Sequence, residues 1–180
     1  MIKSIRASAA DGAVYYLAAM LEGGEDPRYI ARRLVIAASE DIGNANPTAL
    51  LIAAATEQAA KSIGMPEIRI NLAQAVTYLA ASPKSNAAYL AINAAMADIK
   101  ENGIAAVPDY LCNGETQYQK QRGYGKRYIY PHDDPEGSRR FSYLPDSCSN
   151  ARFYKPKPVG AEKQLGQILE RQGPIRSPQV

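Results

Sequence analysis

Apolar side chains recur at helical spacing through the first hundred residues, and each run is bounded by residues that start or stop helices. Between residues 11 and 21, Val14, Leu17, Ala18 and Leu21 fall on one helical face. Glycine follows four of the five runs, and a proline opens each run after the first. The pattern predicts five short antiparallel helices over residues 11–21, 27–41, 48–63, 66–81 and 83–102. Strand-type alternation is absent, so the predicted fold class is all-α.

After Gly103 the chain becomes rich in proline and aromatic residues. Seven prolines between 108 and 174 rule out long helices there. The aromatic residues are Tyr110, Tyr118, Tyr124, Tyr128, Tyr130, Phe141, Tyr143, Phe153 and Tyr154. Because buried rings remove a large apolar area from water, we expect an ordered extension packed on the helices. A last helix is predicted over residues 161–170, with Leu165, Ile168 and Leu169 as its apolar face, and fraying is expected beyond Gly173.

The composition is that of a globular chain without a membrane span. Apolar residues make up 46% of the sequence, and no apolar run reaches the ~18 residues of a spanning helix. Cys112 and Cys148 are the two cysteines and His132 is the single histidine. These residues argue against a disulfide scaffold and a structural zinc site, and they favour a reducing, cytoplasmic setting.

Charge is unevenly distributed along the chain. Residues 119–157 hold nine Lys or Arg against four Asp or Glu, a net +5 in a chain of net +3. Within this segment Tyr124 and Tyr128 alternate with Lys126 and Arg127, a combination that could stack on bases and neutralise phosphates. The alternative is that the tyrosines are core anchors, that the glycines at 123 and 125 serve a turn, and that the charges are simply solvated.

Sequence motifs for catalysis are missing. The Gly-Tyr-Gly-Lys string at 123–126 lacks the spacing and the hydroxyl residue of a nucleotide-binding loop. His132 could titrate or act as a base, but a lone loop histidine is usually structural. The sequence predicts no catalytic residue, no metal ligand and no cofactor site, and therefore no enzyme activity for this chain.

Three charged residues break the helix-dipole preference. Glu40 and Asp41 lie at a predicted helix C-terminus, and Lys84 lies at a predicted N-terminus. Asp41 also continues the apolar stripe of Ile30, Leu34 and Ala37, so it should point partly inward. We predict a polar anchor in which Lys84 reaches one of the two carboxylates and joins two helices; the alternative is that all three side chains are solvated.

Seven short strings occur in an order that resembles one known family. They are LEGGEDP at 21–27, YIARRL at 29–34, ASEDIG at 38–43, SPKSNA at 82–87, GYGK at 123–126, YPHD at 130–133 and YLP at 143–145. Together they resemble the C-terminal region of the replication-associated recombination protein A family. This family is also called RarA or MgsA, and it includes the Werner-helicase-interacting protein. Residues 134–140 depart from the family pattern, so no role is carried over to them.

The resemblance implies the C-terminal part of a clamp-loader-like AAA+ ATPase that acts on DNA at stalled replication forks. Residues 1–8 would be a remnant of the preceding lid domain, residues 9–112 a helical oligomerisation bundle similar to a clamp-loader collar, and residues 113–180 a basic extension. The ATP and magnesium sites would lie in a motor domain outside this chain. The implied partners are further copies of the chain, most simply as a homotetramer, and DNA, single-stranded or junction. The implied location is cytoplasmic and nucleoid-associated, without membrane contact.

Two functions of different classes therefore remain open from the sequence. The first is an oligomerisation domain, and the second is a nucleic-acid-binding module that uses residues 119–157. The mass of the chain in solution, with and without single-stranded DNA, separates them.

Overall fold

A computed structural model describes residues 1–174 and divides the chain into two compact units. The first unit comprises residues 1–92 and 154–166, and the second comprises residues 93–153 and the described residues from 167 onward. All regular structure in the described residues is helical, which confirms the all-α prediction. None of the described helices is both long and apolar enough to cross a bilayer. The expected fraying beyond Gly173 concerns mainly residues 175–180, which lie outside the described residues.

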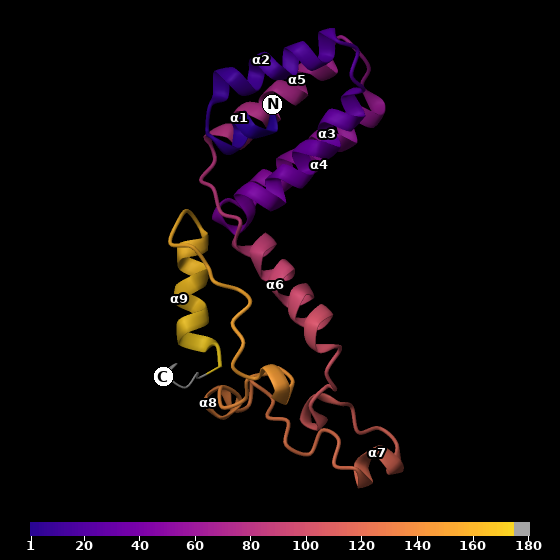
Figure 1. Cartoon of the computed structure of the whole chain (residues 1–180), viewed down its shortest axis with the longest axis vertical. Helices are drawn as coiled ribbons and strands as arrows, with labels where there is room; N and C mark the ends of the chain where they lie inside the picture. The colour runs from indigo at the N-terminus through magenta and orange to yellow at the C-terminus, as the bar shows by residue number, and fades with distance from the viewer. Residues whose placement is uncertain (175–180) are drawn as a thin grey trace. The chain divides into compact units, whose positions relative to one another are not determined.

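Five α-helices build the body of the first unit (Figure 1). They are α1 (Ile2–Arg6), α2 (Ala10–Glu22), α3 (Pro27–Ala37), α4 (Thr48–Ser62) and α5 (Ile68–Ala81). Helix α3 packs along α4, and α5 packs against both α2 and α4. The core contains large aliphatic side chains from these helices and many fully buried alanines, which let the helices approach closely. The largest are Ile5, Ile30, Leu34, Ile68, Leu72, Val76 and Leu79.

The start of α3 follows the predicted local chemistry. The Asp26 carboxylate accepts a hydrogen bond from the backbone N–H of Arg28 at 2.9 Å, and Pro27 occupies the first helical position. Helix α3 does not simply stop near Asp41, because it continues as a π-helical turn, η1 (Ala38–Ile42), and a 3₁₀ turn, η2 (Gly43–Ala45). These turns place Asp41 on the inner side of the helix end, where it is 7% exposed.

Two helix starts differ from the sequence prediction. Helix α5 begins at Ile68 instead of Pro66, and the next helix, α6 (Ala87–Asn102), begins four residues after Pro83. Residues 82–86 are used differently: the Ser82 and Ser85 side chains are buried, and Ser85 Oγ accepts a hydrogen bond from the backbone N–H of Ala87 at 3.3 Å. A side-chain hydrogen bond to the first residue of the helix therefore accompanies a start four residues after the proline that was predicted to open it.

Short turns and a small aromatic core organise the second unit. Its elements after α6 are η3 (Asp109–Leu111), α7 (Gln117–Gln121), α8 (Pro135–Ser138) and η4 (Asp146–Cys148). The Tyr110 and Phe141 ring centroids lie 4.7 Å apart, and Tyr143 lies 6.2 Å and 6.4 Å from them. The Tyr143 N–H also donates to the Tyr110 hydroxyl at 3.2 Å. Several predicted ring anchors therefore pack on one another.

The last helix, α9 (Glu162–Gln172), matches the predicted segment to within two residues at its end. Leu165, Ile168 and Leu169, its predicted apolar face, are 37–47% exposed. Residues 154–166, which include the first turn of α9, belong to the first unit, and we call them the strap. The chain thus leaves the first unit after residue 92 and returns to it at residue 154.

Candidate functional site

The acidic pair at the end of α3 binds an arginine that the sequence reading assigned to a remnant of another domain. Arg6 Nε lies 2.5 Å from Asp41 Oδ1, and Arg6 Nη2 lies 3.2 Å from Asp41 Oδ2 and 3.4 Å from Glu40 Oε1. This two-point contact joins α1 to the π-helical turn, and the hydrogen bond to Asp41 raises the pKa of Arg6. Since Ile5 of the same short helix is fully buried, α1 is an integral part of the first unit.

Lys84 lies near this cluster but bonds to other atoms. Its ammonium donates to the carbonyl oxygens of Ser82 and Ala80 at 2.5 Å and 2.9 Å and to Ser8 Oγ at 3.1 Å. Among the ion pairs of residues 1–174, Lys84 pairs with neither Glu40 nor Asp41 within 4.0 Å. Burial lowers the pKa of Lys84, and the charge of Asp41 opposes that shift. The two carboxylates therefore bind Arg6. Lys84 lies nearby, and its ammonium donates to carbonyl groups instead.

The strap is held to the first unit by a buried carboxylate. Glu162 is fully buried, and its Oε1 accepts a hydrogen bond from the Tyr154 hydroxyl at 2.7 Å. Asn44 Nδ2 donates to the same hydroxyl oxygen at 3.0 Å. Burial and the bond to Glu162 raise the pKa of Tyr154. Glu162 Oε2 has no hydrogen-bond partner among the described residues, so Tyr154 supplies the one side-chain donor that this carboxylate has there.

A backbone contact fixes the strap beside this carboxylate. The Ala161 N–H donates to the carbonyl oxygen of Ala45 at 2.9 Å. Gly160 has φ +52°, and a Cβ added there would lie 2.1 Å from the same carbonyl oxygen and 2.9 Å from Pro83 Cγ. The position therefore requires glycine, both for its left-handed backbone and for the close approach. Earlier in the strap, Lys157 Nζ donates to Asn86 Oδ1 at 2.7 Å.

The predicted DNA-contact segment around Tyr124 to Tyr128 lies in the second unit. Some of its residues form a turn, and others are exposed to solvent. Gly123 and Gly125 have φ +87° and +72° and form a tight turn, in which the Gly125 N–H donates to the Asp109 carbonyl oxygen at 2.9 Å. Tyr124 is half-buried, whereas Tyr128 is exposed, as are Lys126 and Arg127. The glycines therefore serve a turn, while Lys126, Arg127 and Tyr128 could still meet a ligand.

Two nearby carboxylates make Arg127 less suited to the predicted contact with DNA phosphates. It lines an open groove of about 440 Å³ together with Asp109 and Asp146. These two acids offset its charge and weaken its attraction for a phosphate. His132 is exposed and its ring centroid lies 5.0 Å from that of Tyr130, which makes it a surface ring contact.

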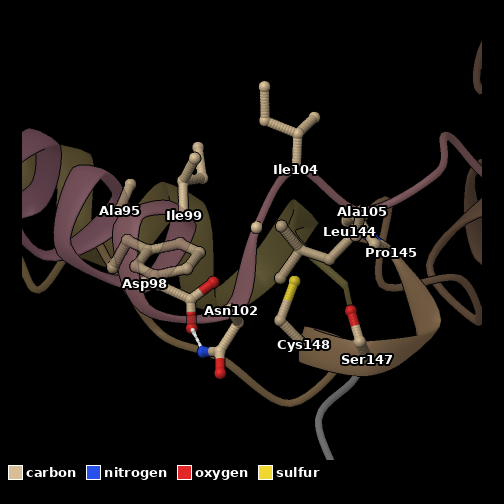
Figure 2. Close-up of a pocket in the computed structure, with 12 residues that line it drawn as sticks. Ala95, Asp98, Ile99, Asn102, Ile104, Ala105, Leu144, Pro145, Ser147 and Cys148 are labelled. Carbon is tan, nitrogen blue, oxygen red and sulfur yellow. Dashed lines mark hydrogen bonds between the residues drawn. The ribbon is translucent and has the colours of Figure 1, made fainter.

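A second open pocket of about 360 Å³ lies at the C-terminal end of α6 (Figure 2). Ile99 and Ile104 project to the same side of it, and Leu144 and Cys148 contribute from the later loop. Asp98, its one carboxylate, accepts a hydrogen bond from Asn102 Nδ2 at 3.0 Å. The lining therefore suits an apolar side chain better than it suits acid–base chemistry.

Comparison with known proteins places the chain. The family model described as "MgsA AAA+ ATPase C terminal" matches residues 7–172. The chain belongs to this family. It is 41% identical to replication-associated recombination protein A of Escherichia coli, over 93% of the chain and 38% of that protein. It is 44% identical to the protein of the same name from Bacillus subtilis, over 94% of the chain and 40% of that protein. It is 38% identical to ATPase WRNIP1 of Dictyostelium discoideum, over 86% of the chain and 18% of that protein.

The chain spans less than half the length of these MgsA relatives. The matched region includes Asp41, which binds Arg6, and it also includes the strap and the basic segment. Sequence reasoning missed Arg6 and Glu162 as contact residues. The sequence did contain a signal for Arg6. A carboxylate that points inward, as Asp41 was expected to do, needs a cationic partner, and Lys3 and Arg6 in the segment before α2 had been given no partner.

Proposed function

We propose that this chain is the self-assembly region of a AAA+ ATPase that works in replication-associated recombination. In this proposal the chain performs no catalysis itself. The ATP and magnesium sites and the DNA-dependent ATPase activity belong to a motor region outside it, and the protein acts at the nucleoid in the cytoplasm. The names of the MgsA relatives support the process, and their AAA+ family supports the ATPase.

The observation that carries self-assembly is the number of large apolar side chains left exposed around a filled core. Tyr15 and Leu51 are each 69% exposed, and Ile70 is 65% exposed. They lie on α2, α4 and α5, the helices whose inner faces already form the core. Apolar surface of this extent on a helical bundle is typical of a protein contact surface.

We expect the isolated chain to sediment as a homotetramer of four 19.5 kDa copies. An obligate interface of this kind buries upwards of ~2,000 Å² in total, so the assembly should persist at micromolar concentration. Sedimentation velocity over a concentration series measures the mass. A monomer at tens of micromolar would remove the proposal.

A second candidate function, DNA binding, rests on the exposed side chains of Lys126, Arg127 and Tyr128. Two cations and a ring on one turn can neutralise phosphates and stack on a base. We expect weak binding of single-stranded DNA whose affinity falls by ~0.7 log units per log unit of salt for each phosphate neutralised. The double variant Lys126→Ala with Arg127→Ala should flatten that slope and leave the melting temperature unchanged.

The matched control removes two charges from the first unit, with Arg28→Ala and Lys61→Ala. These side chains form exposed surface ion pairs, so their loss should not change the salt slope. Equal effects of the two double variants would mean that net charge alone attracts DNA. Binding that is undetectable at low salt would exclude this second function.

A further inference from the structure

Residues 103–107 form an apolar stretch of the second unit whose backbone groups are unpaired, and we call them the edge segment. The edge segment joins the end of α6 to η3 and has no regular structure of its own. Ile104 is 88% exposed and Val107 is 60% exposed. Among residues 1–174, the backbone N–H groups of residues 104–107 find no acceptor and the carbonyl oxygens of residues 103–106 find no donor. Such a stretch offers free donors and acceptors, as the edge of a sheet does.

Two cavities lie along the edge segment, and every residue that lines them belongs to the second unit. The first is the pocket of about 360 Å³ at the Ile104 end, which we call the apolar pocket (Figure 2). The second is the groove of about 440 Å³ along residues 105–110, which we call the acidic groove. Ala105 and Pro145 line both cavities, so the two adjoin each other beside the edge segment.

The acidic groove carries carboxylates without a partner. Asp109 and Asp146 line it, and their side chains form no ion pair or hydrogen bond with the described residues. Asp98 adds a carboxylate in the apolar pocket, and Arg127 is the cation of the acidic groove. Three carboxylates against one guanidinium make the two cavities together negative. They therefore attract a cationic group.

We propose that the edge segment binds an extended, basic segment of a partner protein as an added strand. The partner backbone would pair with the free N–H and carbonyl groups of residues 103–107, while its side chains enter the two cavities. A large apolar side chain would fill the apolar pocket beside Leu144 and Phe153. A lysine or arginine two or about four residues away would point to the same side of the strand and reach Asp109 and Asp146.

The chemistry of the edge segment favours a peptide over a nucleic acid. A peptide strand presents N–H and carbonyl groups in alternation, which are the groups that the edge segment lacks. A phosphate backbone would meet the carboxylates of Asp109 and Asp146, with Arg127 as the cation of that groove to attract it. This binding activity is separate from self-assembly and from the DNA contact at Lys126 and Tyr128.

The test is fluorescence anisotropy of the full chain with labelled, threonine-rich peptides of about eight residues, a usual strand length. Each peptide carries one leucine and one lysine at a spacing of two or about four residues, in either order. We expect at least one to bind, and its counterpart with glutamate in place of lysine to bind about 10-fold more weakly. The double variant Asp109→Asn with Asp146→Asn should weaken the lysine peptide by a similar factor.

The matched control removes two carboxylates from α2 in the first unit, with Asp11→Asn and Glu22→Gln. Both side chains are exposed and form no ion pair among the described residues, so peptide affinity should not change. Circular dichroism should show the same helicity for both double variants and the unmodified chain.

Cys148 provides a second measurement, because its side chain lines the apolar pocket (Figure 2). In a Cys112→Ser background, bound peptide should slow the alkylation of Cys148 by N-ethylmaleimide several-fold. Methylation of the peptide nitrogens should abolish both binding and protection, because an added strand needs its N–H groups. Cys112 in a Cys148→Ser background is the control, since it lines neither cavity and should stay equally reactive.

Three results would overturn the proposal. The first is that none of the lysine peptides binds at about millimolar concentration. The second is binding that is equally strong with glutamate in place of lysine or that leaves the reactivity of Cys148 unchanged. The third is that the Asp109→Asn, Asp146→Asn variant keeps its peptide affinity but binds single-stranded oligothymidylate more tightly, which would assign the acidic groove to the DNA contact.

Discussion

Replacement of Gly160 by alanine is expected to release the strap from the first unit. It should lower the free energy of unfolding of the protein by about 3 kcal/mol. Two costs combine. A non-glycine residue in the left-handed region costs roughly 1–2 kcal/mol. The new Cβ would also lie 2.1 Å from the Ala45 carbonyl oxygen, which must then lose its bond from the Ala161 N–H. An unpaired buried carbonyl adds about 1–3 kcal/mol.

Urea denaturation followed by circular dichroism measures this loss, and limited proteolysis within residues 154–166 reports strap release. Gly24→Ala is the matched control, since Gly24 has φ +82° but no atom within 4 Å of an added Cβ. It isolates the backbone strain, which should cost roughly 1–2 kcal/mol and should leave the strap protected. Equal losses for the two variants would mean that the contact with Ala45 contributes nothing.

Removal of the Tyr154 hydroxyl, by Tyr154→Phe, should cost about 2 kcal/mol. Glu162 is fully buried, and one of its oxygens already lacks a partner in the described part of the chain. Loss of the Tyr154 donor leaves the second oxygen unpaired as well, and a buried unpaired polar group costs about 1–3 kcal/mol. The position of Glu162 at the start of α9 moderates the cost, because a helix N-terminus favours negative charge.

A double-mutant cycle separates this contact from the loss of a hydroxyl in general. In the background of Glu162→Met, Tyr154→Phe should cost much less, with a coupling of about 1–2 kcal/mol. Tyr128→Phe is the surface control, and its effect should stay within about 0.5 kcal/mol. A coupling close to zero would show that Tyr154 and Glu162 do not depend on each other.

Local signals in the sequence predicted the helices well. Proline at a first helical position and glycine after a run act through a few neighbouring residues, so α2, α3, α4 and α9 lie close to their predicted ranges. The start of α6 was misplaced because residues 82–86, anchored by the buried side chains of Ser82 and Ser85, adopt another conformation. That constraint comes from tertiary packing, which a local pattern does not contain.

The contacts that hold the first unit together were harder to predict. Asp41 was expected to face inward from its place in the stripe of α3, and it is buried. Its partner Arg6 lies 35 residues earlier, where no periodicity connects the two. Glu162 was assigned to a helix whose apolar face is elsewhere, and its burial depends on the path of the strap around Ala45. Contacts across such distances follow from the fold and not from spacing along the chain.

The return of the strap has a consequence for the order in which the protein forms on the ribosome. Helices α1 to α5 are all synthesised before residue 92, but the strap follows about sixty residues later. At translation rates of roughly 5–20 residues per second, the nascent bundle waits on the order of 3–12 seconds for residues 154–166. During that interval the Ala45 carbonyl and Asn44 lack the partners that the strap supplies. The bundle therefore has a defined period of incompleteness during each round of synthesis, in which its surface is open to chaperones or to premature pairing with another nascent chain.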